Sequence, residues 1–521
     1  TLDGLAGTPR VDATISLRAD SLALLARRFG VSLPDTAAHT PIALDGTVKG
    51  DVDAATVALT AAALGADLRL DGRLATLLDT PTYDLAVNLN HPDFVAFAES
   101  LGDDIRFARR DLGKVQISAT IAGDSVAARI NDLDAELGPS RLGGSMMVRF
   151  DGAKPSIDAD ITAGEIHADL FQVVASTTGT GDSSLSAASG ATGTTAGRWS
   201  SLPIDFSGLS AVDATARVNA TALIFRKYRF EEVALRLTLA GGVLDIEELS
   251  GRLYGAPAKL RARFTDTSPP TAALALTLQG ADLEAVLIDA AEIDVASGKL
   301  DLTARFQTQG RSEQELVSAL GGEGSVAVRQ GLIKGINLGR LNTQLANIDN
   351  EIALVGLIGD ALSGGVTPLH SLDGTFSASN GVIRSTDFRA VLDGGEGSAV
   401  TTVDLTRWQL SMNSEFRLTG HPNAPPIGLL LMGPIDNPQR EIRDKALKAH
   451  ITEKVFSTVA RKLAPAVTGQ SGVVDGLLEA LAGSGQAPQE TAPAEGDPIP
   501  PPEASPENLF ENLLQGIIQG N

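Results

Sequence analysis

Residues Leu253–Leu287 read LYGAPAKLRARFTDTSPPTAALALTLQGADLEAVL, and they contain the plan of the fold. An edge with Leu and Gly leads into a first strand, a turn with two prolines, a second alternating strand and a short helix. The same order of features recurs in Leu64–Phe97 and in Leu137–Phe171. A unit that repeats along a chain indicates tandem modules of one architecture.

Apolar and polar residues alternate along the strands of these units. Leu85, Val87 and Leu89, for example, are separated by Ala86 and Asn88. A period of two gives a strand one apolar face and one wet face, which is the pattern of an antiparallel sheet. Short helices are expected where an Asp stands in the N-cap position, at Ser21–Phe29, Phe94–Leu101 and Leu283–Ala291, and Gly30 and Gly102 would end the first two.

Composition excludes several classes of function. The chain has 521 residues, with 42 Lys and Arg against 64 Asp and Glu, so its formal net charge is −22. No surplus of cations is present to displace the counterions of nucleic acid, so no nucleic-acid partner is expected. The 54 Gly and 25 Pro favour many short strands over long helices. The absence of Cys removes disulfides, thiolate metal sites and Cys nucleophiles.

The sequence contains no constellation typical of catalysis. The six histidines are scattered, and neither a nucleophile elbow nor a phosphate-binding loop is present. Asp51 with Asp53, and Asp158 with Asp160, place paired carboxylates on a strand face that could hold Ca²⁺, although a solvated strand face is the favoured interpretation. We therefore predict a protein that is not an enzyme and has no cofactor and no metal site.

The termini and apolar runs bear on membrane attachment. The longest apolar run, residues 427–432, is far shorter than the roughly 20 residues that a membrane-spanning helix needs. The chain opens at Thr1 without a signal peptide, in a region where a strand-like pattern is already present. We interpret it as a piece of a longer protein.

The C-terminal part changes character. A helix is expected over Arg440–Leu463, where Leu447, Ile451 and Val455 begin an apolar stripe at four-residue steps. Its many basic residues could bind an anionic membrane surface, but packing of the stripe on the sheet is the favoured interpretation. Residues 483–506 are rich in Pro and Glu, which predicts disorder, and Glu507–Gln519 could form a short amphipathic helix.

Roughly two dozen strands, each with one apolar face, must bury that face against something. Few and short helices cannot cover so many strands, and an uncovered face would exceed what soluble monomers usually expose. Either the sheets fold on themselves, or one long curved sheet has its inner face filled by a hydrophobic ligand. At about 4.8 Å per strand such a sheet would extend on the order of 100 Å. The 4% aromatic content with abundant Leu, Val, Ile and Ala suits acyl chains better than a flat cofactor.

From Glu315 onward the chain resembles the C-terminal region of the AsmA family, bacterial envelope proteins related to TamB. The matching motifs, in order, are the LGGEG turn at 320–324, GLIKGINL at 331–338, Asn380-Gly381, and GPIDNP at 433–438. The resemblance implies a mainly β fold in which tandem antiparallel β modules form one elongated curved sheet with a hydrophobic groove, with short helices between modules and amphipathic helices at the C-terminus. It also implies a periplasmic protein, anchored to the inner membrane through an N-terminal helix that this chain lacks.

The leading hypothesis is bridge-like lipid transfer, in which phospholipid moves between inner and outer membrane along the apolar groove. The partners would be phospholipids, the inner and outer membranes, and envelope proteins at the groove ends. The residues predicted to line the groove share apolar character and alternate along strands: Leu85, Val87, Leu89, Val115, Ile117, Ile121, Ile157, Ile161, Leu235, Leu237, Leu239, Leu274, Leu276, Leu278, Val326 and Val328.

Other functions remain open. A periplasmic scaffold or assembly factor for outer-membrane proteins would have a dry, closed interior and would bind partners through a sheet edge or the C-terminal helices. An adhesin or β-solenoid would need a stricter short repeat, and a hydrolase would need a nucleophile constellation. The expected organisation is β-groove repeats at 1–174 and 199–310, a flexible Ser/Thr/Gly-rich insertion at 175–198, an AsmA-like C-terminal region at 311–440, an amphipathic helical segment at 441–482, a disordered linker at 483–506 and a terminal helix at 507–521.

Overall fold

The computed structural model describes residues 2–3, 10–21, 40–51, 53–100, 111–168, 198–204, 207–346 and 364–463. The chain divides into two units, residues 1–455 and 456–521. The whole sheet belongs to the first unit, and the described part of the second is the end of one helix, residues 456–463. The helices expected at Ser21–Phe29 and Glu507–Gln519, the insertion at 175–197 and the linker at 483–506 lie outside the described residues.

The first part of the sheet consists of short strands with one short helix. Its elements are β1 (Leu2–Asp3), β2 (Arg10–Ala19), β3 (Ile42–Asp51), β4 (Ala54–Ala63), β5 (Ala66–Ala75), β6 (Thr82–His91), α3 (Phe94–Ser100), β7 (Val115–Gly123), β8 (Ala127–Leu137), β9 (Ser140–Arg149) and β10 (Ser156–His167).

The second part has longer strands and more helices. Its elements are η2 (Ser207–Ser210), β11 (Asp213–Phe225), β12 (Tyr228–Ala240), β13 (Val243–Leu253), β14 (Ala256–Thr265), β15 (Thr271–Asp282), α4 (Leu283–Ala291), β16 (Ala296–Gln309), α5 (Glu313–Ser318), β17 (Gly321–Lys334), α6 (Leu338–Ala346), β18 (Val366–Ser379), β19 (Val382–Leu392), β20 (Gly395–Asp404), β21 (Gln409–Leu418), β22 (Ile427–Pro434), β23 (Gln439–Arg443) and α8 (Lys445–Leu463).

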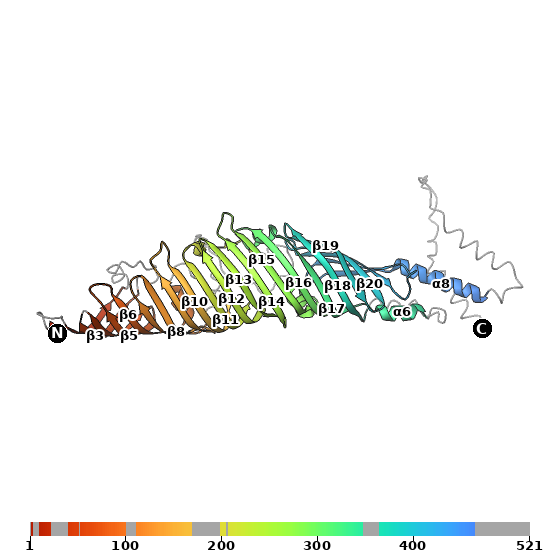
Figure 1. Ribbon diagram of the computed structural model, residues 1–521. Coiled ribbons are helices and arrows are strands. Elements are labelled where there is room, and N and C mark those ends of the chain that lie inside the picture. The colour runs from red at the N-terminus through yellow and green to blue at the C-terminus, as the bar shows by residue number, and fades with distance from the viewer. Residues whose placement is uncertain are drawn as a thin grey trace, which may run out of the picture. The chain divides into compact units, whose positions relative to one another are not determined.

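All 23 strands belong to one sheet, in which each strand pairs with its neighbour in the sequence. Figure 1 shows this succession, with strands from β3 to β20 following one another in chain order. Among the described strands β1 pairs with β2 alone and β23 with β22 alone, so the sheet is open. The prediction of a mainly β protein built as one long sheet is confirmed.

One pairing departs from the antiparallel pattern. Strands β10 and β11 run parallel, with Ser156 opposite Asp213 and His167 opposite Ile224. A parallel pair needs a crossover connection from the end of one strand back to the level at which the next strand begins, and here it is the long segment between β10 and β11. The Ser/Thr/Gly-rich insertion predicted from the sequence belongs to this crossover.

Short sequence motifs explain how several elements begin or end. Ser312 is the N-cap of α5, where its hydroxyl accepts a hydrogen bond from the Glu315 N–H, and the Glu315 carboxylate accepts one from the Arg311 N–H at 2.7 Å. Asn380 and Gly381 both have positive φ, 51° and 73°, as a two-residue hairpin turn between β18 and β19 requires.

The C-terminal helix begins later than the sequence predicted. The expected helix started at Arg440, but residues 439–443 form β23 and α8 starts at Lys445. Arg440 and Ile442 lie opposite Leu431 and Leu429 of β22. Pairing with an otherwise open edge satisfies backbone groups of this segment in the sheet ladder, and this tertiary interaction outweighs the helical periodicity.

Candidate functional site

The residues predicted to line a groove all lie on one face of the sheet. Because directly opposite residues share a face, the strand register connects them. Leu85 and Leu89 of β6 are opposite Ile121 and Ile117 of β7. Farther along the chain the same face includes the pairs Ile157–Val148, Ile161–Val218, Leu235–Leu249, Leu237–Ile246, Leu239–Leu244, Leu274–Phe306, Leu276–Leu260, Leu278–Leu302, Val326–Leu302 and Val328–Leu300.

This apolar face continues beyond the residues that the sequence singled out. It begins with Leu17 opposite Leu44 and Val48 opposite Val57 near the N-terminus. At the other end it includes Phe416 opposite Ile427 and reaches the last strand, β23, where Ile442 lies opposite Leu429. The same alternation marks these strands in the sequence, and only the register shows that all of their apolar positions form one surface.

The apolar face is unevenly covered. Of the predicted lining residues Val115, Leu278 and Val328 are buried, with exposed fractions of 1%, 3% and 3%, while the others are half-buried. On β6 the alternate positions Asp84, Ala86 and Asn88 are exposed, which identifies the opposite face as the wet one.

Close packing on the apolar face uses glycines opposite aromatic rings. A Cβ built on Gly374 would lie 2.2 Å from Cδ1 of Phe388, and one on Gly324 would lie 2.3 Å from Cζ of Phe376. Such separations are far below van der Waals contact, so the rings occupy the space that a side chain would need. The aromatic side chains therefore lie flat along the face instead of projecting from it.

Two helices cover the apolar face at its C-terminal end. Leu338 and Leu341 of α6 and Leu447 of α8 have exposed fractions of 0%, and Ile451 of α8 has 1%. They belong to one core with Phe416, Leu418 and Ile427 of the last strands. The favoured sequence interpretation of α8, that its stripe packs on the sheet, is confirmed for Leu447 and Ile451.

The opposite face is polar and carries ion pairs between neighbouring strands. Arg18 lies 2.6 Å from Asp45, and Arg236 pairs with Glu248. Hydrogen bonds from these guanidinium groups hold the pKa of Asp45 and of Glu248 below the usual range. All four groups are solvent-exposed to a substantial degree, so these pairs contribute little stability and mainly keep this face wet.

Hollows of about 660 and 720 Å³ open mainly among residues of this polar face. Both include Arg305 and Glu323 in their lining. Leu274 lines the first hollow, and Ile117 lines a third hollow of about 420 Å³; both are predicted lining residues. The candidate site is therefore an extended surface and not an enclosed cavity.

The ends of the strands form two rims. The first rim consists of the turns at Gly242, Asp266 and Gly381 together with α5; backbone hydrogen bonds join neighbouring turns, as from the Asp266 N–H to the Gly242 carbonyl at 2.9 Å. The second rim consists of the β11–β12 turn, α4 and α6, and here the Asp282 N–H donates to the Tyr254 carbonyl at 3.1 Å.

A strap, residues 198–204 of the crossover, runs along the first rim. The Trp199 indole N–H donates to the Leu405 carbonyl at 2.8 Å, and the Arg198 guanidinium carbon lies 3.6 Å from the centre of the Trp408 ring. Farther along, the Ile204 N–H donates to the Arg311 carbonyl at 2.6 Å. These contacts join turns that are distant in the sequence.

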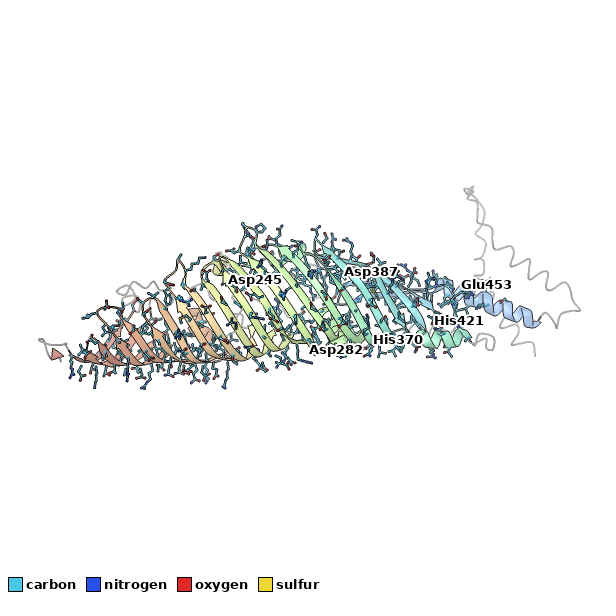
Figure 2. The ribbon with its side chains drawn as sticks, in the orientation of Figure 1. Asp245, Asp282, His370, Asp387, His421 and Glu453 are labelled. Atoms are coloured by element: carbon cyan, nitrogen blue, oxygen red, sulfur yellow. The ribbon has the colours of Figure 1, made fainter. Side chains whose placement is uncertain are left out.

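Chemistry-bearing groups do not converge in the described part of the chain. Figure 2 shows Asp245, Asp282, Asp387, His370 and His421 spread along the sheet. No group of three His, Asp or Glu side chains suited to a metal ion occurs among the described residues. The Asp51 carboxylate instead accepts hydrogen bonds from the N–H groups of Asp53 and Ala54, and Asp158 pairs with Arg149 at 3.4 Å.

No described helix is both long and apolar enough to cross a membrane. A family model described as the AsmA family matches residues 104–388, more than half of the chain. The match covers β7 to most of β19 and includes the LGGEG, GLIKGINL and Asn380-Gly381 motifs, whereas the GPIDNP motif lies beyond it. No curated protein and no solved structure matches the chain.

Proposed function

The chain belongs to the AsmA family, a family of envelope proteins, and on that premise we propose that it binds the acyl chains of phospholipids on its apolar face and conducts them along the sheet between the inner and outer membranes. The acyl chains would slide over half-buried aliphatic side chains while the head groups stay in water. In this proposal the protein is periplasmic, is tethered to the inner membrane, and performs no chemical reaction.

The observation that supports lipid binding best is the continuity of the apolar face. Strands with one wet face and one apolar face follow one another from β2 to β22, and their register places the apolar positions side by side. Between β2 and β9 few apolar side chains are fully buried; the local core, Phe94, Val95, Leu112 and Val115, is confined to α3 and its neighbours. A soluble protein rarely leaves such a surface without an occupant.

Lipid binding is tested on the purified chain by native mass spectrometry, which counts the phospholipids bound to each chain. Extraction with organic solvent then identifies these lipids. The blocking variant Leu237→Asp with Leu276→Asp places two charges on the apolar face. An unpaired charge in an apolar path costs several kcal/mol, so co-purified and transferred lipid should fall sharply. A matched control is Ala234→Asp with Thr277→Asp, which adds the same charges to the same strands on the polar face.

Two outcomes would contradict conduction. Normal lipid transfer by the blocking variant would mean that lipids do not pass over this part of the face. A wild-type chain that is soluble and free of lipid would favour a scaffold or assembly factor for outer-membrane proteins. The observation in favour of that alternative is the edge of β23, which pairs with β22 alone in the described part of the chain and could accept a partner strand.

A further inference from the structure

The tip of the β11–β12 hairpin has an unusual composition for an acidic chain. It reads FRKYR at residues 225–229, with three cations in five positions. Phe225 and Tyr228 remain 40% and 38% exposed although both are aromatic. Aromatic rings beside basic groups are typical of surfaces that contact the head-group layer of lipids.

This tip reaches across to the opposite rim of the sheet. Arg226 of the second rim forms an ion pair with Glu313 of α5, on the first rim, with Nη2 and Oε1 3.5 Å apart. Strands β11 and β12 have 13 residues each, so in a flat sheet the tip would lie about 40 Å from the opposite ends of the strands. The sheet therefore curls until its rims meet here.

The apolar face is on the inside of this curl. Phe230 of β12 has an exposed fraction of 8% although it lies near the tip, and it belongs to one core with Ala220 and Val233. Arg229 of the polar face is 43% exposed in comparison. Anything that moves along the apolar face must pass beneath the Arg226–Glu313 contact.

The ion pair is built so that its partners can exchange. The Arg226 and Glu313 side chains are 59% and 39% exposed, and exposed pairs contribute little free energy. The second oxygen of Glu313 accepts a hydrogen bond from the Ser200 N–H of the strap at 3.1 Å. This bond holds the carboxylate at the mouth of the curled sheet, the place where the two rims meet. The Arg226 guanidinium carbon lies 5.4 Å from the centre of the Phe225 ring, which supports the cation on its side.

We propose that Arg226 and Glu313 form a head-group site for zwitterionic phospholipids at the mouth of the curled sheet. The phosphate of such a lipid replaces Glu313 beside Arg226, and its ammonium group replaces Arg226 beside Glu313, so the pair opens without leaving a charge unpaired. The acyl chains lie on the apolar face below. An anionic lipid without an ammonium group cannot pair with Glu313, and its negative phosphate then lies next to the unpaired carboxylate. Such a lipid therefore passes less readily. This inference rests on the proposed lipid binding and names its preferred cargo.

The test measures the initial rate at which the full chain takes up tail-labelled phosphatidylethanolamine or phosphatidylglycerol from vesicles that contain equal parts of both lipids. Wild type should take up phosphatidylethanolamine faster. Glu313→Gln keeps an oxygen for the Ser200 N–H but loses the charge, and should reduce this preference about threefold, the scale expected for an exposed pair. Arg226→Gln should slow both lipids and leave their ratio unchanged. Glu232→Gln removes a negative charge from an exposed side chain of the same hairpin and serves as the control.

The outcomes separate this inference from the function on which it rests. An unchanged uptake ratio in Glu313→Gln, with both lipids still taken up, refutes the head-group site and leaves lipid binding intact. The same loss of preference in Glu232→Gln also refutes it, because general surface charge would then explain the effect. A wild-type chain that takes up neither lipid refutes the proposed function itself.

Discussion

Shortening one leucine on the covered part of the apolar face and one on its half-buried part should have very different costs. Leu341 of α6 has an exposed fraction of 0% and packs in the core shared with the last strands and α8. Leu276 of β15 lies on the same face of the sheet but is half-buried. The comparison of Leu341→Ala with Leu276→Ala therefore asks whether the face over β14 to β16 is dry core or a surface awaiting a ligand.

The structure sets the expected magnitudes. Leu341→Ala removes buried methyl groups and leaves a cavity that the surrounding helices cannot fill, which costs about 3 kcal/mol. Leu276→Ala in the lipid-free protein loses about half of the transfer free energy of a leucine and opens no closed cavity, so we expect about 1 kcal/mol. Both residues are leucines in regular secondary structure, which makes them a matched pair.

Native-state hydrogen exchange measures both costs in place. The opening free energies of α6 amides in Leu341→Ala and of β15 amides in Leu276→Ala are compared with those of the delipidated wild type. Equal costs of about 3 kcal/mol would refute the reasoning, because they would show that Leu276 is packed as tightly as Leu341 and that no space for lipid exists above it.

Two further predictions concern packing and pH. Gly374→Ala should lower the urea midpoint by an amount equivalent to about 1–3 kcal/mol, because its Cβ would overlap the Phe388 ring. In the control Gly208→Ala the new Cβ meets nothing within 4 Å, so the midpoint should stay nearly unchanged. Equal effects of the two substitutions would contradict the packing argument. Hydrogen bonds from the Thr375 hydroxyl and N–H lower the pKa of Asp387, so its contribution to stability is present above the unfolded pKa and is lost as the pH falls through the folded pKa. Asp387→Asn should therefore destabilise the chain at neutral pH and lose its effect in acid, and a difference from wild type that is independent of pH would contradict this assignment.

Much of the fold could be predicted because its signals are local. Alternation within single strands, as at Leu85, Val87 and Leu89, identified an apolar face that the register confirms. The N-caps at Asp93 and Asp282 were also local: their carboxylates accept hydrogen bonds from the Ala96 and Ala285 N–H groups. The role of the predicted lining residues in lipid contact stays a prediction.

Other features depended on partners distant in the sequence. Arg440 was assigned to a helix because its periodicity fits one, but the free edge of β22 recruits it into β23. The parallel pairing of β10 with β11 has no signature in either strand, since Ile157 and Ile161 would alternate in the same way in either orientation.

The sequence by itself determined that this protein consists of many strands with one apolar face each, because hydrophobic period, turn glycines and caps act within a few residues of each other. It also determined that the chain contains none of the sequence motifs typical of catalysis. Only the tertiary structure decided that the sheet curls until Arg226 meets Glu313, and that α6 and α8 cover one end of its apolar face. The curvature of the sheet accumulates from the twist at many strand pairs, and the coverage of its face depends on contacts between distant segments. No local sequence pattern specifies either of these.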